Sequence, residues 1–150
     1  METQTVNTRY RNERHRAVAN LLFTYNNIAS RLQKILQPHN LTLQQFNVLR
    51  ILERFHPEPV CNFAIREQLL DSRSDITRIV DRLIKEDLAI RKICGEDRRK
   101  VSITITSKGL ELLDELKPLH QDMDGIMDML DGNELEELNR LLEKIRSQLT

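Results

Sequence analysis

The sequence predicts a mainly α-helical fold with a small β-ribbon, and three observations support this prediction. Apolar residues recur at helical spacing along most of the 150 residues, and only four glycines and four prolines interrupt them. Residues 88–94 and 100–106 are rich in β-branched residues and flank a charged turn, 95–99, which is the pattern of a hairpin. An amphipathic helix pattern with basic residues, 72–85, directly precedes this hairpin.

The bulk composition limits the classes of protein to which the chain can belong. It is 39% hydrophobic and 31% charged, and its length suits one compact domain or a small domain with elements that dimerise it. The sequence has no run of about 18 apolar residues and no apolar segment near Met1 that resembles a secretory signal. We therefore expect a cytoplasmic protein in which Cys61 and Cys94 are reduced thiols rather than a disulfide.

Charge is unevenly distributed along the chain, although the formal net charge is zero. Residues 72–100 hold nine Lys or Arg and six Asp or Glu, a net of +3, whereas residues 111–143 hold two bases and eleven acids, a net of −9. Residues 1–16 add four Arg against two Glu. A neutral chain can therefore present one basic face to phosphate and turn its acidic part away. The alternative, that each charge run is only a solvated helix face, explains the segregation less well.

Helix starts can be placed from capping residues, which are Ser, Thr, Asp or Asn before an apolar periodic run. The expected caps are Thr42 with Gln45, Asn62, Ser72 with Asp75, Ser107, and Asp131 with Glu134. After a long first helix ended by Pro38, they predict helices over 42–54, 62–70 and 72–85, then C-terminal helices divided near Pro118. In the short helix over 62–70, the side chains expected to face inward are Phe63, Ile65 and Leu69.

The helix over 72–85 has two contrasting faces. Its apolar residues follow the spacing i, i+3, i+4, i+7, i+8 and are expected to be buried: Ile76, Ile79, Val80, Leu83 and Ile84. The opposite face holds Ser74, Arg78, Asp81, Arg82 and Lys85, with Arg73 at its start. A short helix, a tight turn and such a helix form a helix-turn-helix, and the hairpin adds a wing. A helix that fits a major groove beside a ribbon tip that fits a minor groove is suited to reading DNA.

We therefore predict a mainly α winged helix-turn-helix with a small β wing, bracketed by N- and C-terminal dimerisation helices. The DNA-binding domain spans 40–107, the N-terminal dimerisation helix 1–39 and the C-terminal dimerisation helices 108–150, all in one integrated fold. The apolar stripes at both ends exceed what so small a core can cover, which predicts a two-fold homodimer. Two recognition helices separated by one or more turns of duplex, ~34 Å each, would read a palindrome.

The wing carries a signature that is specific to one family. Asp97-Arg98-Arg99 is followed by Lys100 to Thr104, then Ile105-Thr106, and Ser107-Lys108-Gly109 opens the next helix. This pattern closely resembles the D-x-R, five residues, Leu-Thr signature of the MarR family of transcriptional regulators, with Ile in place of Leu. The order of the other elements agrees, so the resemblance spans nearly the whole chain.

The resemblance implies a homodimer that binds a pseudo-palindromic operator in double-stranded DNA, usually as a repressor. It also implies inducers that are small phenolic or aromatic anions, lodged between the dimerisation helices and the winged domain. By the matching positions, Arg99 would enter the minor groove, held in place by Asp97, and Arg98 would be a neighbouring phosphate or minor-groove contact.

The residues expected to contact DNA lie on the recognition helix and at the ribbon tip. The first turns of such a helix normally reach base edges, and its free N–H groups can bind phosphate. The expected DNA-binding set is Ser72, Arg73, Ser74, Thr77, Arg78 and Arg82 from the helix, and Arg98 and Arg99 from the wing. Lys85 is a phosphate contact or plain surface. Asp81 would repel phosphate, so we expect it to form a salt bridge within the protein.

Other functions have weaker support. A winged module that binds protein instead of DNA has no reason to place two arginines at the ribbon tip. A regulator that senses metal or redox state would need a zinc site from His56, Cys61 or His120, or a reactive Cys61 or Cys94. The first helix holds no cysteine of the kind used by peroxide-sensing members of the family. No catalytic motif or phosphate-binding Gly loop is present, so we expect neither an enzyme nor a bound cofactor.

The sequence defines an effector pocket less well than any other feature. Aromatic residues and methionines at helical spacing are more often core than pocket lining. The candidates for such a lining are Phe23, Tyr25, Phe46, Met123, Met127 and Met129. Arg16 or Arg31 would be available to hold the carboxylate of an anionic effector.

Overall fold

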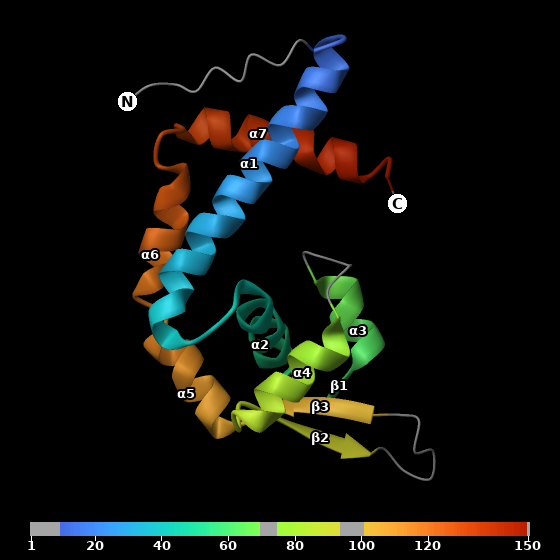
Figure 1. Ribbon diagram of the computed structural model, residues 1–150, viewed down its shortest axis with the longest axis vertical. Helices are drawn as coiled ribbons and strands as arrows, with labels where there is room; N and C mark the ends of the chain where they lie inside the picture. The colour runs from blue at the N-terminus through green and yellow to red at the C-terminus, as the bar shows by residue number, and fades with distance from the viewer. Residues whose placement is uncertain (1–9, 70–74, 94–100, 150) are drawn as a thin grey trace.

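The computed structural model of the chain describes residues 10–69, 75–93 and 101–149 (Figure 1). Within these ranges the α-helices, 3-10 helices (η) and strands are α1 (Glu13–Leu36), η1 (Gln37–His39), α2 (Leu43–Phe55), β1 (Val60–Cys61), α3 (Asn62–Gln68), α4 (Ile76–Lys85), β2 (Ala89–Ile93), β3 (Val101–Ile105), α5 (Ser107–Glu115), α6 (Leu119–Asp124), η2 (Gly125–Met127) and α7 (Gly132–Arg146). The fold is mainly α with a small antiparallel sheet, as predicted. In this part of the chain, no helix is both long and apolar enough to cross a membrane.

Most of the hydrophobic core lies in the winged domain, which comprises α2 to β3, and the core extends to Leu36 of α1 and to Leu113 and Leu116 at the end of α5. Helices α2, α3 and α4 contact one another in pairs. The sheet contacts all three helices, through β3 with α2 and α3, through β1 with α3 and through β2 with α4. The side chains with less than 2% of their surface exposed include Val48, Leu49, Leu52, Ile65, Ile76, Val80, Leu83 and Ile103. The predicted apolar stripe of α4 is therefore confirmed, with Ile79 and Ile84 half-buried at its margin.

The predicted hairpin is confirmed, because β2 and β3 pair antiparallel, and a third strand that was not predicted extends the sheet in the order β1-β3-β2. Strand β1 pairs Val60 with Ile103 and Cys61 with Ser102, while β2 pairs along all of β3. Two residues are too few to show an alternating pattern, which is why the sequence does not reveal β1. Because β3 is the central strand, both Ser102 and Ile103 are buried.

Two of the predicted helix caps are confirmed as complete capping boxes. Thr42 Oγ1 accepts from the Gln45 N–H at 3.1 Å, and the Thr42 N–H donates to Gln45 Oε1 at 2.9 Å. Asp131 and Glu134 make the same reciprocal pair at the start of α7, at 2.9 Å each. The division at Pro118 is also confirmed, since α5 ends before it and α6 begins after it.

Three predicted caps are wrong, in each case by one to three positions. Helix α4 has Asp75 rather than Ser72 as its N-cap, and Thr106 rather than Ser107 caps α5. Cys61, not Asn62, occupies the N-cap position of α3 and makes no side-chain cap bond. Where two capping residues lie close together in sequence, local preference does not decide between them, and the tertiary position of the first turn does.

Helix α3 also corrects the prediction that Phe63 faces inward. Its side chain is 68% exposed, whereas Ile65 is fully buried and Leu69 is half-buried. Residues two positions apart on a helix point about 200° away from each other, so Phe63 and Ile65 cannot both face the core. The pair Ile65 and Leu69, four positions apart, shares the inward face.

The terminal helices carry apolar side chains that the chain itself does not cover. Figure 1 shows α1 extending away from the winged domain and α7 at the same end of the molecule as the start of α1. Between 39% and 80% of the side-chain surface is exposed at Val18, Leu21, Leu22, Phe23 and Tyr25 of α1 and at Leu141, Ile145 and Leu149 near the C-terminus. We call these eight residues the arm surface.

Candidate nucleic-acid interface

Burial of one face of α4 directs the other face outwards. The Asp75 carboxylate accepts from the Arg78 N–H at 3.2 Å and starts the helix at Ile76. Because Ile76, Val80 and Leu83 lock the inner face into the core, the remaining polar residues are all exposed: Thr77, Arg78, Asp81, Arg82 and Lys85.

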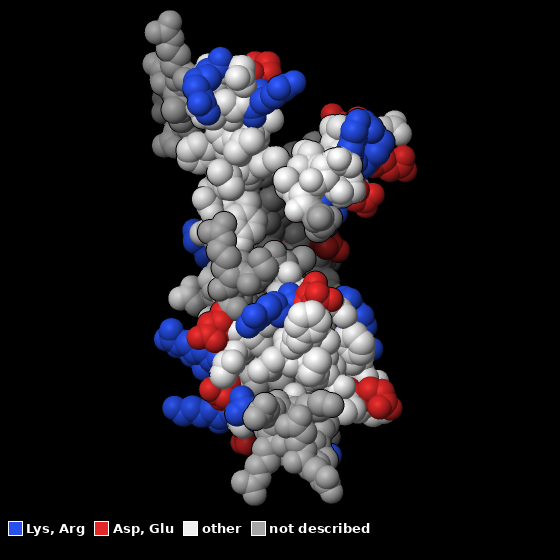
Figure 2. All heavy atoms as spheres, turned by 90° about the vertical axis from the view of Figure 1, so that its right-hand side faces the viewer, with Lys and Arg blue, Asp and Glu red and all other residues white. Residues whose placement is uncertain are grey.

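Three cations form one stripe on this exposed face. Arg78, Arg82 and Lys85 are spaced i, i+4, i+7, which places them along one side of the helix. None of the three forms an ion pair with another residue in the described ranges. Figure 2 shows basic side chains projecting from one edge of the lower lobe, which is the winged domain, with some acidic ones beside them. The stripe is therefore free to contact an anionic partner such as a phosphate backbone.

The expectation that Asp81 forms an internal salt bridge is confirmed. Its carboxylate lies 2.5 Å from the Arg91 guanidinium of β2, and these side chains are 55% and 36% exposed. An ion pair this exposed contributes only about 0–1 kcal/mol to stability. Its clearer effect is geometric, because it links α4 directly to β2, a strand of the wing.

The base of the wing is held against the start of α5. At the turn between α4 and β2, where Asp87 has a φ of 60°, the Thr106 hydroxyl donates to the Asp87 carbonyl at 2.6 Å. Lys108 Nζ donates to the Glu86 carbonyl at 2.9 Å. A Cβ on Gly109 would lie 2.4 Å from the Leu88 carbonyl oxygen, so only glycine permits this approach. The wing and the C-terminal helices are thus tightly connected.

Several predicted DNA-binding residues lie outside the described residues. They are Ser72, Arg73 and Ser74 before α4, and Asp97, Arg98 and Arg99 between β2 and β3. The structure brings Thr77, Arg78 and Arg82 onto the exposed face of α4. It also pairs Ile93 with Val101, so the two ends of the described wing strands are adjacent.

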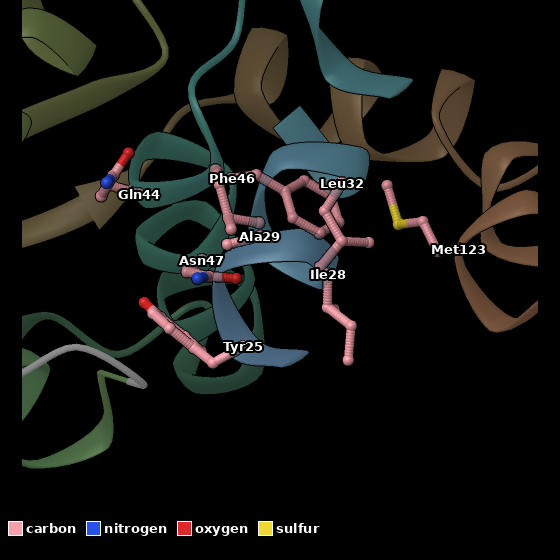
Figure 3. A pocket seen from close by; sticks show the side chains of 9 residues that line it. Tyr25, Ile28, Ala29, Leu32, Gln44, Phe46, Asn47 and Met123 are labelled. Carbon is pink, nitrogen blue, oxygen red and sulfur yellow. The ribbon is translucent and has the colours of Figure 1, made fainter. Parts of the chain in front are cut away.

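An open apolar pocket lies where α1, α2 and α6 meet, with a volume of about 260 Å³. It is lined by Tyr25, Ile28, Ala29, Leu32, Leu43, Gln44, Phe46, Asn47 and Met123 (Figure 3). Three members of the predicted aromatic and methionine set therefore line it. The other predicted members, Phe23, Met127 and Met129, do not, and neither does Arg16 or Arg31.

Gln33 fixes the relative position of two walls of this pocket. Its Nε2 donates to the Leu41 carbonyl at 3.1 Å, and its Oε1 accepts from the Leu43 N–H at 2.9 Å. These bonds join α1 to Leu41, just before α2, and to Leu43, the first residue of α2. Because Leu32 and Leu43 line the pocket, this clamp sets the distance between them.

The metal and redox alternatives receive no support from the described side chains. Among them, no group of three or more His, Cys, Asp or Glu is placed to hold a metal ion. His120 Nε2 instead lies 3.1 Å from Arg50 Nη1. Cys61 is exposed and carries a free thiol, and Cys94 lies outside the described residues.

Comparison with known proteins identifies the family to which the chain belongs. A family model described as "MarR family" matches residues 41–101. The HTH-type transcriptional regulator MhqR of Bacillus subtilis is 30% identical over 122 residues, which cover 81% of this chain and 83% of MhqR. The chain belongs to the MarR family. As a member of this family it is a transcriptional regulator, and its relatives are named as regulators or repressors rather than as enzymes.

Two further similar proteins are informative. The homoprotocatechuate degradative operon repressor of Escherichia coli is 28% identical over 116 residues, 77% of each chain. A cysteine variant of Escherichia coli MarR, solved in complex with operator DNA, superposes with a TM-score of 0.76 at 23% identity, covering 86% of this chain and 93% of that one. The second likeness supports the fold alone.

The sequence did not predict the roles of two residues that position others, Arg91 and Gln33. Arg91 was visible only as half of a basic pair with Lys92 in a predicted strand. Gln33 was visible as a polar residue within the apolar stripe of the first helix, between Leu32 and Leu36. A polar side chain on an otherwise apolar face is a usable signal for a buried or half-buried hydrogen bond.

Proposed function

We propose that this MarR-family regulator is a homodimeric repressor that binds a pseudo-palindromic operator and is released by a small aromatic effector. The observation that carries the proposal is the cationic stripe of Arg78, Arg82 and Lys85, which faces outwards beside the wing and has no ion-pair partner among the described residues. The exposed face of α4 has the shape and charge to enter a major groove.

Dimerisation is supported by the arm surface. Eight large apolar side chains at 39% to 80% exposure form an unusually apolar surface for a protein that remains monomeric. Covering them with the same surface of a second copy gives a two-fold assembly, and such symmetry suits an operator with two half-sites.

The proposed DNA contacts are those predicted from the sequence. Thr77 and Arg78 would reach base edges, together with Arg73 and Ser74, while Ser72 and Arg82 would hold phosphates. Arg99 would enter the minor groove from the wing, supported by Asp97, and Arg98 would contact a neighbouring phosphate or the minor groove. Repression would be steric, because an occupied operator blocks polymerase.

Release is proposed to act through the pocket between α1, α2 and α6. Its walls belong to a dimerisation helix and to the winged domain, so its occupation can change how one is oriented on the other. The ligand would shift the population towards dimers whose recognition helices no longer match the groove spacing, which requires that it bind one state more tightly. The named role of the Escherichia coli homoprotocatechuate operon repressor makes an aromatic effector reasonable for a relative.

The test is a fluorescence-anisotropy titration with a duplex that the protein itself selects from a random library. For the wild type, log affinity should fall with log salt at a slope of about −0.9 per neutralised phosphate. Replacement Arg82→Ala removes one phosphate contact from each subunit of the proposed dimer, so the slope should become shallower by about 1.8, twice the value for one phosphate. Loss of a guanine contact in Arg78→Ala should reduce discrimination by ~1–3 kcal/mol in each half-site. Arg99→Ala should weaken binding to every duplex.

The matched control is Arg140→Ala, which removes one guanidinium from α7, where it is paired with Glu137 at 2.6 Å. Operator affinity should be unchanged in this variant. A wild type whose affinity shows no salt dependence, or an Arg78→Ala/Arg82→Ala double variant that binds like the wild type, would show that α4 does not contact DNA.

A further inference from the structure

The exposed face of α4 carries one acidic residue among its cations. Asp81 lies three residues after Arg78 and four residues before Lys85, so it shares their side of the helix. A carboxylate in this position repels an anionic partner. Its side chain is 55% exposed, so packing in the core does not account for it. The partner of Asp81 therefore decides what this position does.

Arg91 reaches Asp81 from the neighbouring strand. Strand β2 runs back alongside α4 after the turn at residues 86–88, and the two elements contact each other (Figure 1). Arg91 pairs with the fully buried Ile103 of β3, so its side chain leaves the sheet on the side of the core and of α4. There its Nη2 donates to Asp81 Oδ1 at 2.5 Å. The guanidinium is thus held at the boundary between α4 and the wing.

The Arg91 guanidinium keeps donors for a second acceptor. An arginine side chain has five N–H donors in a planar fork, and among the described residues only Asp81 accepts from this one. The Arg91 side chain is 36% exposed. Because two parallel N–H groups of such a fork fit two oxygens of one phosphate, the remaining donors suit a phosphate group.

The boundary between α4 and the wing determines which part of a duplex these donors face. In the proposed complex, α4 occupies a major groove and the ribbon tip occupies a minor groove. Neighbouring grooves of a duplex are separated by a sugar-phosphate strand. A guanidinium between the two protein elements therefore faces a phosphate of that strand rather than a base edge.

We propose that Arg91 binds a backbone phosphate between the two grooves, and that Asp81 is the positioning residue that holds its guanidinium there. This inference rests on the proposed function, and it adds Arg91 to the DNA-binding residues predicted from the sequence. The pair leaves the charge of the cationic stripe intact, because Arg91 balances Asp81. A guanidinium that is already held in place loses less conformational freedom when DNA binds.

Two other roles for the pair lead to different expectations. If Arg91 only shields DNA from the charge of Asp81, removal of both side chains restores wild-type binding. If the pair only holds the wing in place, removal of either side chain has the same effect. The salt dependence of binding separates these roles, because its slope counts the neutralised phosphates.

The experiment measures operator affinity by fluorescence anisotropy at several salt concentrations, with full-length wild type, Arg91→Ala, Asp81→Ala and the double variant. Arg91→Ala should bind about tenfold more weakly. Its slope should be shallower by about 1.8, because each subunit of the proposed dimer loses one phosphate contact. The double variant should match Arg91→Ala, although its net charge equals that of the wild type.

Asp81→Ala isolates the positioning role. Its slope should equal that of the wild type, because the Arg91 cation is still present. Its affinity should be a few-fold lower, although the substitution removes a negative charge from the face of α4, because the guanidinium must then be ordered when DNA binds.

The matched control is Lys92→Ala. Lys92 follows Arg91 on β2 and pairs with Ser102, so its side chain leaves the opposite face of the sheet. The variant loses the same charge from the same strand and should keep the wild-type slope. Thermal melts establish that all variants are folded, and little change is expected from the loss of so exposed an ion pair.

Ethylation of single backbone phosphates locates the contact. At one phosphate in each half-site, between the contacted major and minor grooves, ethylation should weaken binding of the wild type and have no effect on binding of Arg91→Ala. Ethylation of the other contacted phosphates should weaken binding of both proteins.

A wild-type slope in Arg91→Ala, wild-type binding by the double variant, or an equal loss of slope in Lys92→Ala would overturn the phosphate contact. Affinity of Asp81→Ala at or above that of the wild type would overturn the positioning role. Either result leaves the proposed function standing if Arg82→Ala shows its expected change in slope. If neither Arg82→Ala nor Arg91→Ala changes the slope, the proposed function itself is contradicted.

Discussion

In the winged domain, Leu49, Leu83 and Ile103 are fully buried, whereas Leu22 and Phe23 of α1 are 60% and 52% exposed. Both regions satisfy the same helical pattern of apolar residues, so sequence periodicity does not distinguish them. The winged domain is compact because three helices and a sheet close around its apolar faces. The start of α1 and the whole of α7, which has no fully buried residue, have no such neighbours within one chain. An apolar stripe thus indicates that a helix will be covered, but not by which molecule.

Two equivalent truncations should separate the regions most clearly. Leu49→Ala should lower the free energy of unfolding by ~2–5 kcal/mol at any protein concentration, because it leaves a cavity in the core. Leu22→Ala should have little effect on a monomer and should instead increase the dissociation constant of the proposed dimer. Urea denaturation at several protein concentrations checks both. A large, concentration-independent loss in Leu22→Ala would mean that α1 is covered within its own chain.

The clamp between the two regions should give an intermediate effect. Gln33→Leu removes both bonds to residues 41 and 43 and should destabilise the protein by ~1–3 kcal/mol, because a part-buried N–H and carbonyl lose their partner. Gln33→Glu keeps the acceptor for the Leu43 N–H and should lose less. Thermal melts rank the three proteins. If Gln33→Leu melts like the wild type, water replaces the clamp and the position of α1 is set by packing alone.

The smallest change in stability is expected at the link within the winged domain. Asp81→Asn should alter the free energy of unfolding by about 0–1 kcal/mol, since both partners are largely solvated. A double-mutant cycle with Arg91→Gln measures the coupling between the two side chains. A coupling well above 1 kcal/mol would show that the bridge holds the wing more firmly than its exposure suggests.

The ion pair between Glu137 and Arg140 on α7 gives little information about what covers either region. The hydrogen bonds that Arg140 donates to Glu137 lower the pKa of the Glu137 carboxyl, and the same bonds raise the pKa of the Arg140 guanidinium. Both groups are fully exposed, so they keep the outer side of the helix charged without fixing its position. The exposed apolar side of α7 is the surface that we expect a partner to cover.

Much of the fold was predictable because its signals are local. The capping boxes at Thr42 and Asp131, the break at Pro118 and the buried stripe of α4 depend only on residues within a turn or two of each other, and the structure confirms each. The candidate site was predictable to the same extent, since an outward cationic face follows once Ile76, Val80 and Leu83 are assigned inwards.

The features that the sequence did not predict depend on distant partners. Strand β1 exists because β3, some 40 residues later in the chain (60 to 103), pairs with it. The cap of α4 is Asp75 because packing places the first turn at Ile76, and Phe63 is exposed because Ile65 occupies the inward position. Arg91 and Gln33 acquire roles only when Asp81 and the start of α2 are brought to them.

The sequence by itself determined the class of fold, the family and the polarity of α4, since periodicity, capping and the wing signature are properties of neighbouring residues. Only the tertiary structure decided which stripes the chain covers, which helices meet at the pocket and which of the described residues line it. Burial and electrostatics depend on distances between segments that the linear order does not specify.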